Sequence, residues 1–245
     1  MSATPDRPTG ELRNAQPEGF LMTGTATVTS DNRVGVLRLY DYELSGNCYK
    51  VRLLLHWLGL AYTRIPVDFH PGRAHRSPAF IDHVNPRGQL PVLQDGDFLL
   101  PDAQAILVYL ASRHDPNGCW YPADAPTRAR ITLWLATADD ITRTVSAARL
   151  HLAFGYPADL PLCQTGGRAV LRLLDDQLSE NQSAGREWLA ATHPTIADIA
   201  CFPYAALAGE AGIDLVAFPA LQRWIGNLRH LPGFIAMPGI LDPAL

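Results

Sequence analysis

The stretch LYDYELSGNCYKVRLLLHWL, which starts at Leu39, constrains the fold more than any other part of the chain. Its first residues continue an apolar, β-favouring run, and its last residues repeat apolar side chains at helical spacing. A polar Ser45-Gly46-Asn47 turn separates the two patterns. We therefore expect a strand that ends near Tyr42 and a helix that runs on from about Cys48.

Ser45 lies where this expected strand passes into the N-terminus of the expected helix. A helix N-terminus offers unpaired backbone N–H groups and the positive end of the helix dipole, and both stabilise an anion. The serine hydroxyl adds a further hydrogen-bond donor. Ser, Gly and Asn are also ordinary capping residues, so the turn by itself leaves two interpretations open, a simple cap and an anion site.

The overall composition argues against several classes of protein. A formal net charge of −4 over 245 residues disfavours a nucleic-acid partner, which would need a basic surface. No apolar run is long enough to span a membrane. Scattered cysteines suggest neither a disulfide framework nor a metal site, and favour a reduced, cytoplasmic setting. These cysteines are Cys48, Cys119, Cys163 and Cys201.

The chain divides into four expected segments. Residues 1–33 are rich in Thr, Pro, Gly, Asp and Asn without any period, which predicts a disordered arm, and Met22 within it is an alternative start of translation. Residues 34–115 form the first domain, and residues 116–126 a linker dense in Pro, Gly and Asp. Residues 127–245 carry helical patterns almost throughout, which predicts an all-helical second domain.

The elements expected in residues 34–115 follow the order βαβ and then ββα. A second strand over Ala61–Val67 should lie parallel to the first, because a helix connects the two. Pro91 opens a third strand, and the Asp95-Gly96 turn leads from it into a fourth. A helix follows from Asp102 to Arg113, with Asp102 as its cap. The expected fold class is thus an α/β domain followed by an all-α domain.

In the second domain, Thr195 and Asp198 form a capping signature that should start a central helix, so Asp198 is expected to be structural rather than catalytic. Apolar positions from Ile131 to Leu152 mark one long helix before it.

These motifs, taken together and in order, resemble the soluble glutathione S-transferases, and the first turn is similar to the serine turn of the zeta class. The matching motifs are Ser45-Gly46-Asn47, Lys50-Val51-Arg52, Asn85-Pro86 with Gln89-Leu90-Pro91, Asp102 to Leu110, and Thr195-Ile196-Ala197-Asp198. The resemblance implies a thioredoxin-like glutathione-binding domain followed by an all-helical substrate domain, with glutathione as co-substrate and no metal.

The resemblance also implies roles for single residues at the thiol end of the site. Ser45 would donate a hydrogen bond to the glutathione sulfur, with Asn47 as a second donor. The Leu90-Pro91 bond would be cis, and the backbone of Leu90, next to Gln89, would pair with the cysteinyl part of glutathione. Free thiols titrate near pH ~8.5, so such donors raise the thiolate fraction at neutral pH. Cys48, one turn into the helix, is the alternative nucleophile, or else a small packed residue.

At the two ends of glutathione the implied contacts differ. Asp102 and the backbone of Ala103 would hold the γ-glutamyl end, although Ala103 replaces the serine usual in the family. The missing hydroxyl removes a charge-assisted hydrogen bond of roughly 1.5–3 kcal/mol. Arg73, His75 and Arg76 are the candidates for the glycyl carboxylate. The pocket for the electrophilic substrate is expected to involve Tyr42, Leu44, Trp134 and Ile141, although Trp134 and Ile141 also suit the core of the helical domain.

Three functions follow as hypotheses. The first is a glutathione S-transferase that moves alkyl or aryl groups onto the thiolate of glutathione. The second is a glutathione-dependent isomerase of a cis-enoyl diacid, which needs cations such as Arg143 or Arg149 for the substrate carboxylates. The third is a glutathione-fold protein that binds ligands without turnover. The resemblance alone implies a homodimer.

Overall fold

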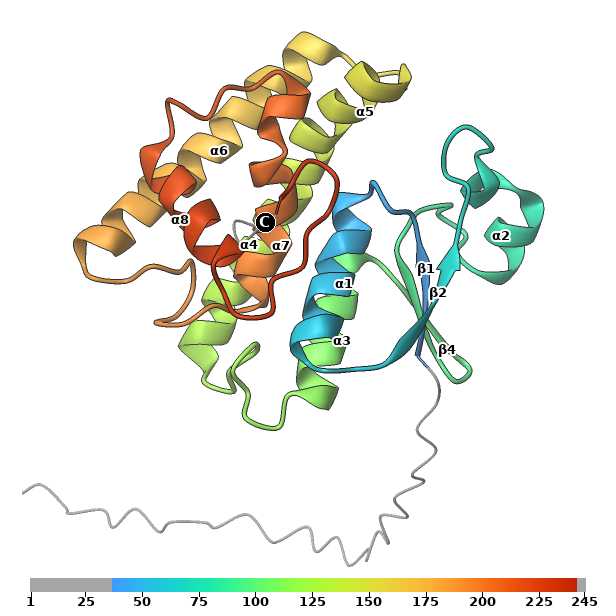
Figure 1. Cartoon of the computed structure of the whole chain (residues 1–245), viewed down its shortest axis with the longest axis horizontal. Coiled ribbons are helices and arrows are strands. Elements are labelled where there is room, and N and C mark those ends of the chain that lie inside the picture. Colours follow the sequence, from blue (N-terminus) through green and yellow to red (C-terminus); the bar gives the residue numbers. More distant parts are fainter. Residues whose placement is uncertain (1–36, 242–245) are drawn as a thin grey trace, which may run out of the picture. The chain divides into compact units, whose positions relative to one another are not determined.

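The computed structural model describes residues 37–241, drawn in colour in Figure 1. The arm expected at residues 1–33, with the alternative start at Met22, lies outside the described residues, as do residues 242–245. Within residues 37–241 the chain forms a sheet domain followed by a helical half.

A four-stranded mixed sheet forms the centre of the first half. Its strands are β1 (Leu37–Asp41), β2 (Tyr62–Pro66), β3 (Val92–Asp95) and β4 (Phe98–Pro101), in the spatial order β2-β1-β3-β4. The β2 strand runs parallel to β1, while β3 and β4 are antiparallel to their neighbours. In the central strand, Tyr40 lies opposite Ile65 on one side and Val92 on the other. The predicted order of strands along the chain, the parallel pairing of β1 with β2 and the hairpin of β3 and β4 are confirmed.

Three helices cover this sheet. The helices α1 (Gly46–Trp57) and α3 (Ala103–His114) pack against each other on one face, and α2 (Pro78–His83) lies on the other (Figure 1). Phe80 anchors α2 in a small apolar cluster with Val67 and Val92. The loop expected over Asp68–Ser77 ends in a single 3₁₀ turn, η1 (Ala74–Arg76). The sequence analysis missed α2, because six residues are too few to show a helical period.

The second half is helical. It comprises α4 (Ala125–Ile141), η2 (Thr142–Ser146), α5 (Ala147–Phe154), α6 (Leu160–Ser183), α7 (Ile196–Ala206), η3 (Ala208–Ala211) and α8 (Pro219–Arg229). The η2 segment is a π-helix, so the long helix expected up to Leu152 is interrupted. The α4 helix begins inside the expected linker 116–126, because Asp124 caps it and Pro126 occupies its first turn, where a proline needs no N–H partner.

The buried helix α7 joins the two halves. It packs against α1 and α3 of the first half and against α4 of the second, and one apolar core runs through all four. Asp198 is fully buried near its start and accepts hydrogen bonds from four groups. The donors are the backbone N–H groups of Leu189 and Thr195, the Thr195 hydroxyl and the Trp224 indole N–H. The structural role expected for Asp198 fits this position.

Within residues 37–241 no helix is long and apolar enough to cross a lipid bilayer.

Candidate functional site

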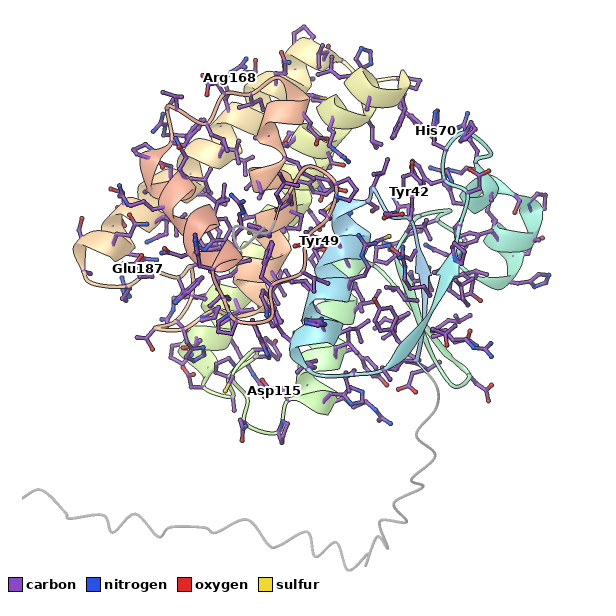
Figure 2. The ribbon with its side chains drawn as sticks, in the orientation of Figure 1. Tyr42, Tyr49, His70, Asp115, Arg168 and Glu187 are labelled. Atoms are coloured by element: carbon purple, nitrogen blue, oxygen red, sulfur yellow. The ribbon has the colours of Figure 1, made fainter. Side chains whose placement is uncertain are left out.

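A cavity of about 540 Å³ lies beside the start of α1. One wall comes from the end of β1, the start of α1, the β2–β3 connection and the start of α3. The other wall comes from α4, η2, α5 and Tyr204. Figure 2 shows Tyr42 where β1 ends, beside the first turn of α1. Most of the residues expected at the site line this cavity. They are Ser45, Asn47, Arg73, His75, Arg76, Gln89, Leu90, Pro91, Asp102, Ala103, Tyr42 and Leu44.

Ser45 caps α1 and faces the cavity. Its backbone is extended, its N–H donates to the carbonyl of Tyr42 at 3.0 Å, and its Oγ accepts a bond from the N–H of Cys48 at 3.2 Å. A hydroxyl that accepts one bond can still donate its own hydrogen. Ser45 can therefore cap the helix and donate to an anion in the cavity at the same time.

The next residue, Gly46, permits a close contact between α1 and α7. A Cβ at this position would come within 2.8 Å of the Tyr204 ring. The Tyr204 hydroxyl in turn accepts a hydrogen bond from the N–H of Asn47 at 3.3 Å, and burial raises the pKa of Tyr204. Sequence reasoning missed Tyr204, because only the packing of α7 on α1 brings it to this turn.

Cys48 belongs to the core rather than to the cavity surface. Its side chain is fully buried, and the N–H of Tyr42 donates to its Sγ at 3.5 Å. Burial, reinforced by the nearby Asp41 carboxylate, raises the pKa of Cys48 to about 12. Its thiol is protonated at neutral pH, which favours the packed role over the nucleophilic one.

The Leu90–Pro91 peptide bond is cis, as the resemblance implied. The turn before it is held by the buried Asn85, whose side chain donates to the carbonyl of Gln89 at 2.9 Å and accepts from the N–H of Arg87 at 3.0 Å. Arg87 also lines the cavity, although the sequence analysis gave it no role. The turn thus presents backbone groups and a guanidinium on one wall.

Asp102 begins α3 in an unusual backbone conformation. Its φ of 81° lies in a region that favours glycine, and its carboxylate accepts a hydrogen bond from the N–H of Ala105 at 3.0 Å. Strained conformations of this kind cluster at ligand sites. Ala103 is buried beside it, and the next residue, Gln104, hydrogen-bonds Asp139 of α4. The Asp102 carboxylate suits an amino group of a ligand, and the N-terminus of α3 suits a carboxylate of the same ligand.

The basic loop contributes two different kinds of residue. Arg73 has a left-handed φ of 52°, and its guanidinium lies 5.7 Å from the ring centre of Tyr156. His75 is buried and stacks on Phe69 with ring centres 4.1 Å apart. Burial and the nearby Arg76 and Arg73 lower the pKa of His75 to about 4. His75 is therefore neutral at physiological pH, so any positive charge for a glycyl carboxylate must come from the arginines.

The cavity has further lining residues to which the sequence analysis gave no role. They are Phe69, Gly88 and Gln104 on the side of the sheet domain, and Thr142, Ser146, Leu150, Phe154 and Tyr156 on the opposite wall, together with Asp139 of α4. Phe69 stacks between Tyr42 and Tyr156, at centre distances of 5.3 and 5.6 Å, and so links the two halves at the cavity. The π-helix η2 supplies Thr142 and Ser146, and π-helical turns are frequent at functional sites.

Two residues expected in the substrate pocket lie elsewhere. Trp134 and Ile141 are buried in the apolar core, Ile141 with 1% of its surface exposed, and neither lines the cavity. The helical period identified the apolar face of α4 correctly. That face turns toward α7 and the core, whereas the cavity takes its wall from Asp139 of α4 and from the residues that follow Ile141.

Arg143 and Arg149, the candidate cations for a diacid, both line the cavity. Arg143 is largely exposed and pairs with Asp140 at 2.5 Å. Arg149 is buried and pairs with Glu210 at 2.5 Å, and it also donates to the carbonyl of Leu44 at 2.8 Å. Each charge already has a carboxylate beside it.

As for metals, residues 37–241 contain no group of three His, Cys, Asp or Glu side chains that could hold an ion.

Comparison with known proteins agrees with this fold. The model of "Glutathione S-transferase, N-terminal domain" matches residues 39–118, and that of "Glutathione S-transferase, C-terminal domain" matches residues 158–232. A maleylacetoacetate isomerase of Pseudomonas aeruginosa is 31% identical over 209 residues, which cover 81% of this chain and 93% of that protein.

Solved structures give the same result. A glutathione S-transferase from Pseudomonas fluorescens is 30% identical, with a TM-score of 0.74 over 82% of this chain and 98% of that one. Ure2p5 from Phanerochaete chrysosporium, cocrystallised with 1-(S-glutathionyl)-2,4-dinitrobenzene, is 27% identical, with a TM-score of 0.68 over 81% of this chain and 91% of that one. The mixed sheet and the helical half thus define a glutathione transferase fold. The chain belongs to the glutathione S-transferase family.

Proposed function

We propose that the protein is a glutathione transferase, which binds glutathione as a thiolate and adds it to an electrophilic small molecule. The observation that carries the proposal is the Ser45 turn, where a hydroxyl with donor capacity lies at the N-terminus of α1 and faces a cavity. A donor and a helix N-terminus favour the thiolate over the thiol. Each unit by which they lower the thiol pKa corresponds to about 1.4 kcal/mol of preferential binding.

The proposed orientation of glutathione follows the charges around the cavity. The γ-glutamyl amino group pairs with Asp102, and its carboxylate takes the N-terminus of α3 at Ala103. The backbone of Leu90 pairs with the cysteinyl part, beside Gln89. The glycyl carboxylate lies toward Arg73 and Arg76, with the neutral His75 as part of the wall.

In the proposed reaction the sulfur attacks an electrophilic carbon and forms a new S–C bond, and the leaving group departs with its electron pair. Ser45 donates a hydrogen bond to the sulfur before attack, and Asn47 is the second candidate donor. The electrophile lies against the other wall, near Tyr42 and Leu44. The related Ure2p5 structure, whose ligand is a glutathionyl dinitrobenzene, supports a site of this kind.

Replacement of Ser45 by Ala tests the proposal, with 1-chloro-2,4-dinitrobenzene as the electrophile. We expect kcat to fall about tenfold or more, the pKa of bound glutathione to rise by about one unit, and the Kd for glutathione at low pH to change little. Ser183→Ala, at an exposed position on α6, is the matched control. Unchanged turnover in Ser45→Ala would refute the role of the serine, and glutathione binding without turnover in the wild type would leave a binding protein.

The 31% identity with a maleylacetoacetate isomerase supports a second candidate, the isomerisation of a cis-enoyl diacid by glutathione. Substrate carboxylates would then need Arg143 or Arg149, and each is already paired with a carboxylate. Transferase activity is therefore the better-supported function. An assay with maleylacetoacetate decides between them, because the isomerase should act on it far faster than on an aromatic halide.

We also propose that the protein acts as a cytoplasmic homodimer without nucleic-acid or membrane partners. Light scattering at low micromolar concentration tests the dimer, since a mass near 26.8 kDa would identify a monomer.

A further inference from the structure

Arg149 connects the helical half of the chain to the turn that carries Ser45. One guanidinium nitrogen donates to the carbonyl of Leu44 at 2.8 Å, and another donates to the carboxylate of Glu210 at 2.5 Å. The Arg149 side chain is 7% exposed, whereas that of Glu210 is 43% exposed. The guanidinium is thus fixed at both sides in a place that excludes most water.

The bond to Leu44 acts on the peptide group next to Ser45. The carbonyl oxygen of Leu44 and the nitrogen of Ser45 belong to one planar unit, so a donor that holds the oxygen also fixes the direction of the Ser45 N–H. That N–H donates to the carbonyl of Tyr42 at 3.0 Å. Arg149 and Tyr42 therefore hold the same peptide group from its two ends, immediately before the serine.

The position of Arg149 in the fold suits this role. It lies on α5 directly after the π-helix η2, whose wider turn changes the rotation of the residues that follow. Glu210 comes from η3, a separate segment that packs against α5. The anchor for the turn therefore comes from two elements of the helical half, while the serine belongs to the other half.

Arg143 provides a contrast on the same wall. Its side chain is 68% exposed, its partner Asp140 is three residues away on the same helix, and it has no bond to the Ser45 turn among the contacts of residues 37–241. A cation that recognises a substrate needs an accessible guanidinium. Arg149 has the opposite properties, with little exposure, a carboxylate partner and a backbone acceptor.

We infer that Arg149 is a positioning residue for the reaction, which orients Ser45 through the Leu44 carbonyl and is itself held by Glu210. The catalytic consequence rests on the proposed function, whereas the structural one does not. Loss of the guanidinium should loosen the turn and misdirect the serine hydroxyl, and misplacements of about 1 Å can cost up to 10²-fold in rate.

The first test needs no ligand. Amide hydrogen exchange is followed at Ser45, Asn47 and Cys48, each of which donates a hydrogen bond within or next to the turn. We expect faster exchange in Arg149→Met and partial protection in Arg149→Lys, which can hold only one of the two acceptors well. Arg168→Met, an exposed arginine of α6 labelled in Figure 2, is the matched control and should match the wild type. Unchanged exchange in Arg149→Met would overturn the inference.

The second test connects the turn to catalysis by a double-mutant cycle with Ser45→Ala. We expect Arg149→Met to lower kcat roughly ten- to a hundredfold with the serine present and far less without it, because it acts through that residue. Equal losses in both backgrounds would overturn this part. If Arg149→Met does not fold, Glu210→Ala replaces it, with a smaller effect in the same direction. If the wild type shows no turnover but amide exchange in Arg149→Met is faster as expected, the proposed transferase activity is refuted. The role of Arg149 in holding the Ser45 turn then stands.

Discussion

Among the helices of residues 37–241 that begin with a hydroxyl residue, α1 and α7 differ in whether that hydroxyl is available to a ligand. Ser45 starts α1 and Thr195 starts α7, both with extended backbone and both with a side-chain oxygen that accepts a backbone N–H. Ser45 is half-buried and faces the cavity, and its Oγ accepts the N–H of Cys48. Thr195 is fully buried, and its hydroxyl both accepts from Ala197 and donates to Asp198.

The difference shows what a capping motif can and cannot indicate. Such a motif locates the start of a helix, because the first N–H groups need an acceptor. Whether the hydroxyl has a donor left for a substrate depends on which elements pack around it. At Thr195 the loop before α7, Asp198 and Trp224 of α8 enclose the cap. At Ser45 the surroundings are open on the cavity side, so the same type of residue can act in chemistry.

The largest effect should come from the buried cap. Asp198→Ala leaves four buried donors without their acceptor, which should lower the free energy of unfolding by on the order of 4 kcal/mol. Asp198→Asn should recover only part of the lost stability, because its NH₂ group would face the N–H of Thr195. Chemical denaturation measures the free energy of unfolding of both variants. A loss below about 1 kcal/mol for Asp198→Ala would show that this network is not the anchor of α7.

Thr195→Val should have a smaller effect on the same network. It keeps the shape of the side chain but removes the acceptor of the Ala197 N–H and one donor to Asp198, at a cost of about 2 kcal/mol. Thr195→Ser keeps the hydroxyl and is the control. Turnover per folded molecule should be unchanged in both. A loss of turnover in Thr195→Val without a loss of stability would end the distinction between a structural and a functional cap.

Ser45→Ala should lose mainly turnover, whereas the Asp198 and Thr195 variants should lose mainly stability. Removal of a cap costs about 1 kcal/mol, because the N–H of Cys48 loses one acceptor. The catalytic loss should exceed the stability loss, since the proposed donor to the thiolate disappears as well. Thermal unfolding and turnover measured on the same preparation give both quantities. A stability loss as large as that of Asp198→Ala, with turnover per folded molecule intact, would make Ser45 a second structural cap.

The fold was predictable because its signals are local. The apolar periods of β1 and α1, the Asp95-Gly96 turn and the Thr195–Asp198 capping box each depend on neighbours in sequence. The short motifs at Ser45, Leu90–Pro91 and Asp102 also reach one cavity, because each stands at the end of an element of the same sheet domain. Their roles toward glutathione remain predictions.

The other wall was less predictable because it depends on tertiary rotation and burial. Trp134 and Ile141 have the spacing of a buried face, and nothing in that spacing tells a core from a pocket. The helical period gives no sign of the π-helix η2, and the ring stacking of Phe69 on Tyr156 joins residues far apart in the sequence. His75 was expected among the cations, but its burial makes it neutral.

The smallest expected effect concerns Cys48, the alternative nucleophile in the same helix start. Its thiol is fully buried, and burial raises its pKa to about 12, so at pH 8 it should resist iodoacetamide while the exposed Cys119 reacts. Cys48→Ala removes a small buried side chain and should cost about 1 kcal/mol in stability, with turnover within a factor of about two. Peptide mapping of alkylated protein and the aromatic-halide assay measure the two outcomes. If alkylation at Cys48 abolished turnover while Ser45→Ala retained it, the reacting sulfur would be the protein's own, and Ser45 would be no more than its cap.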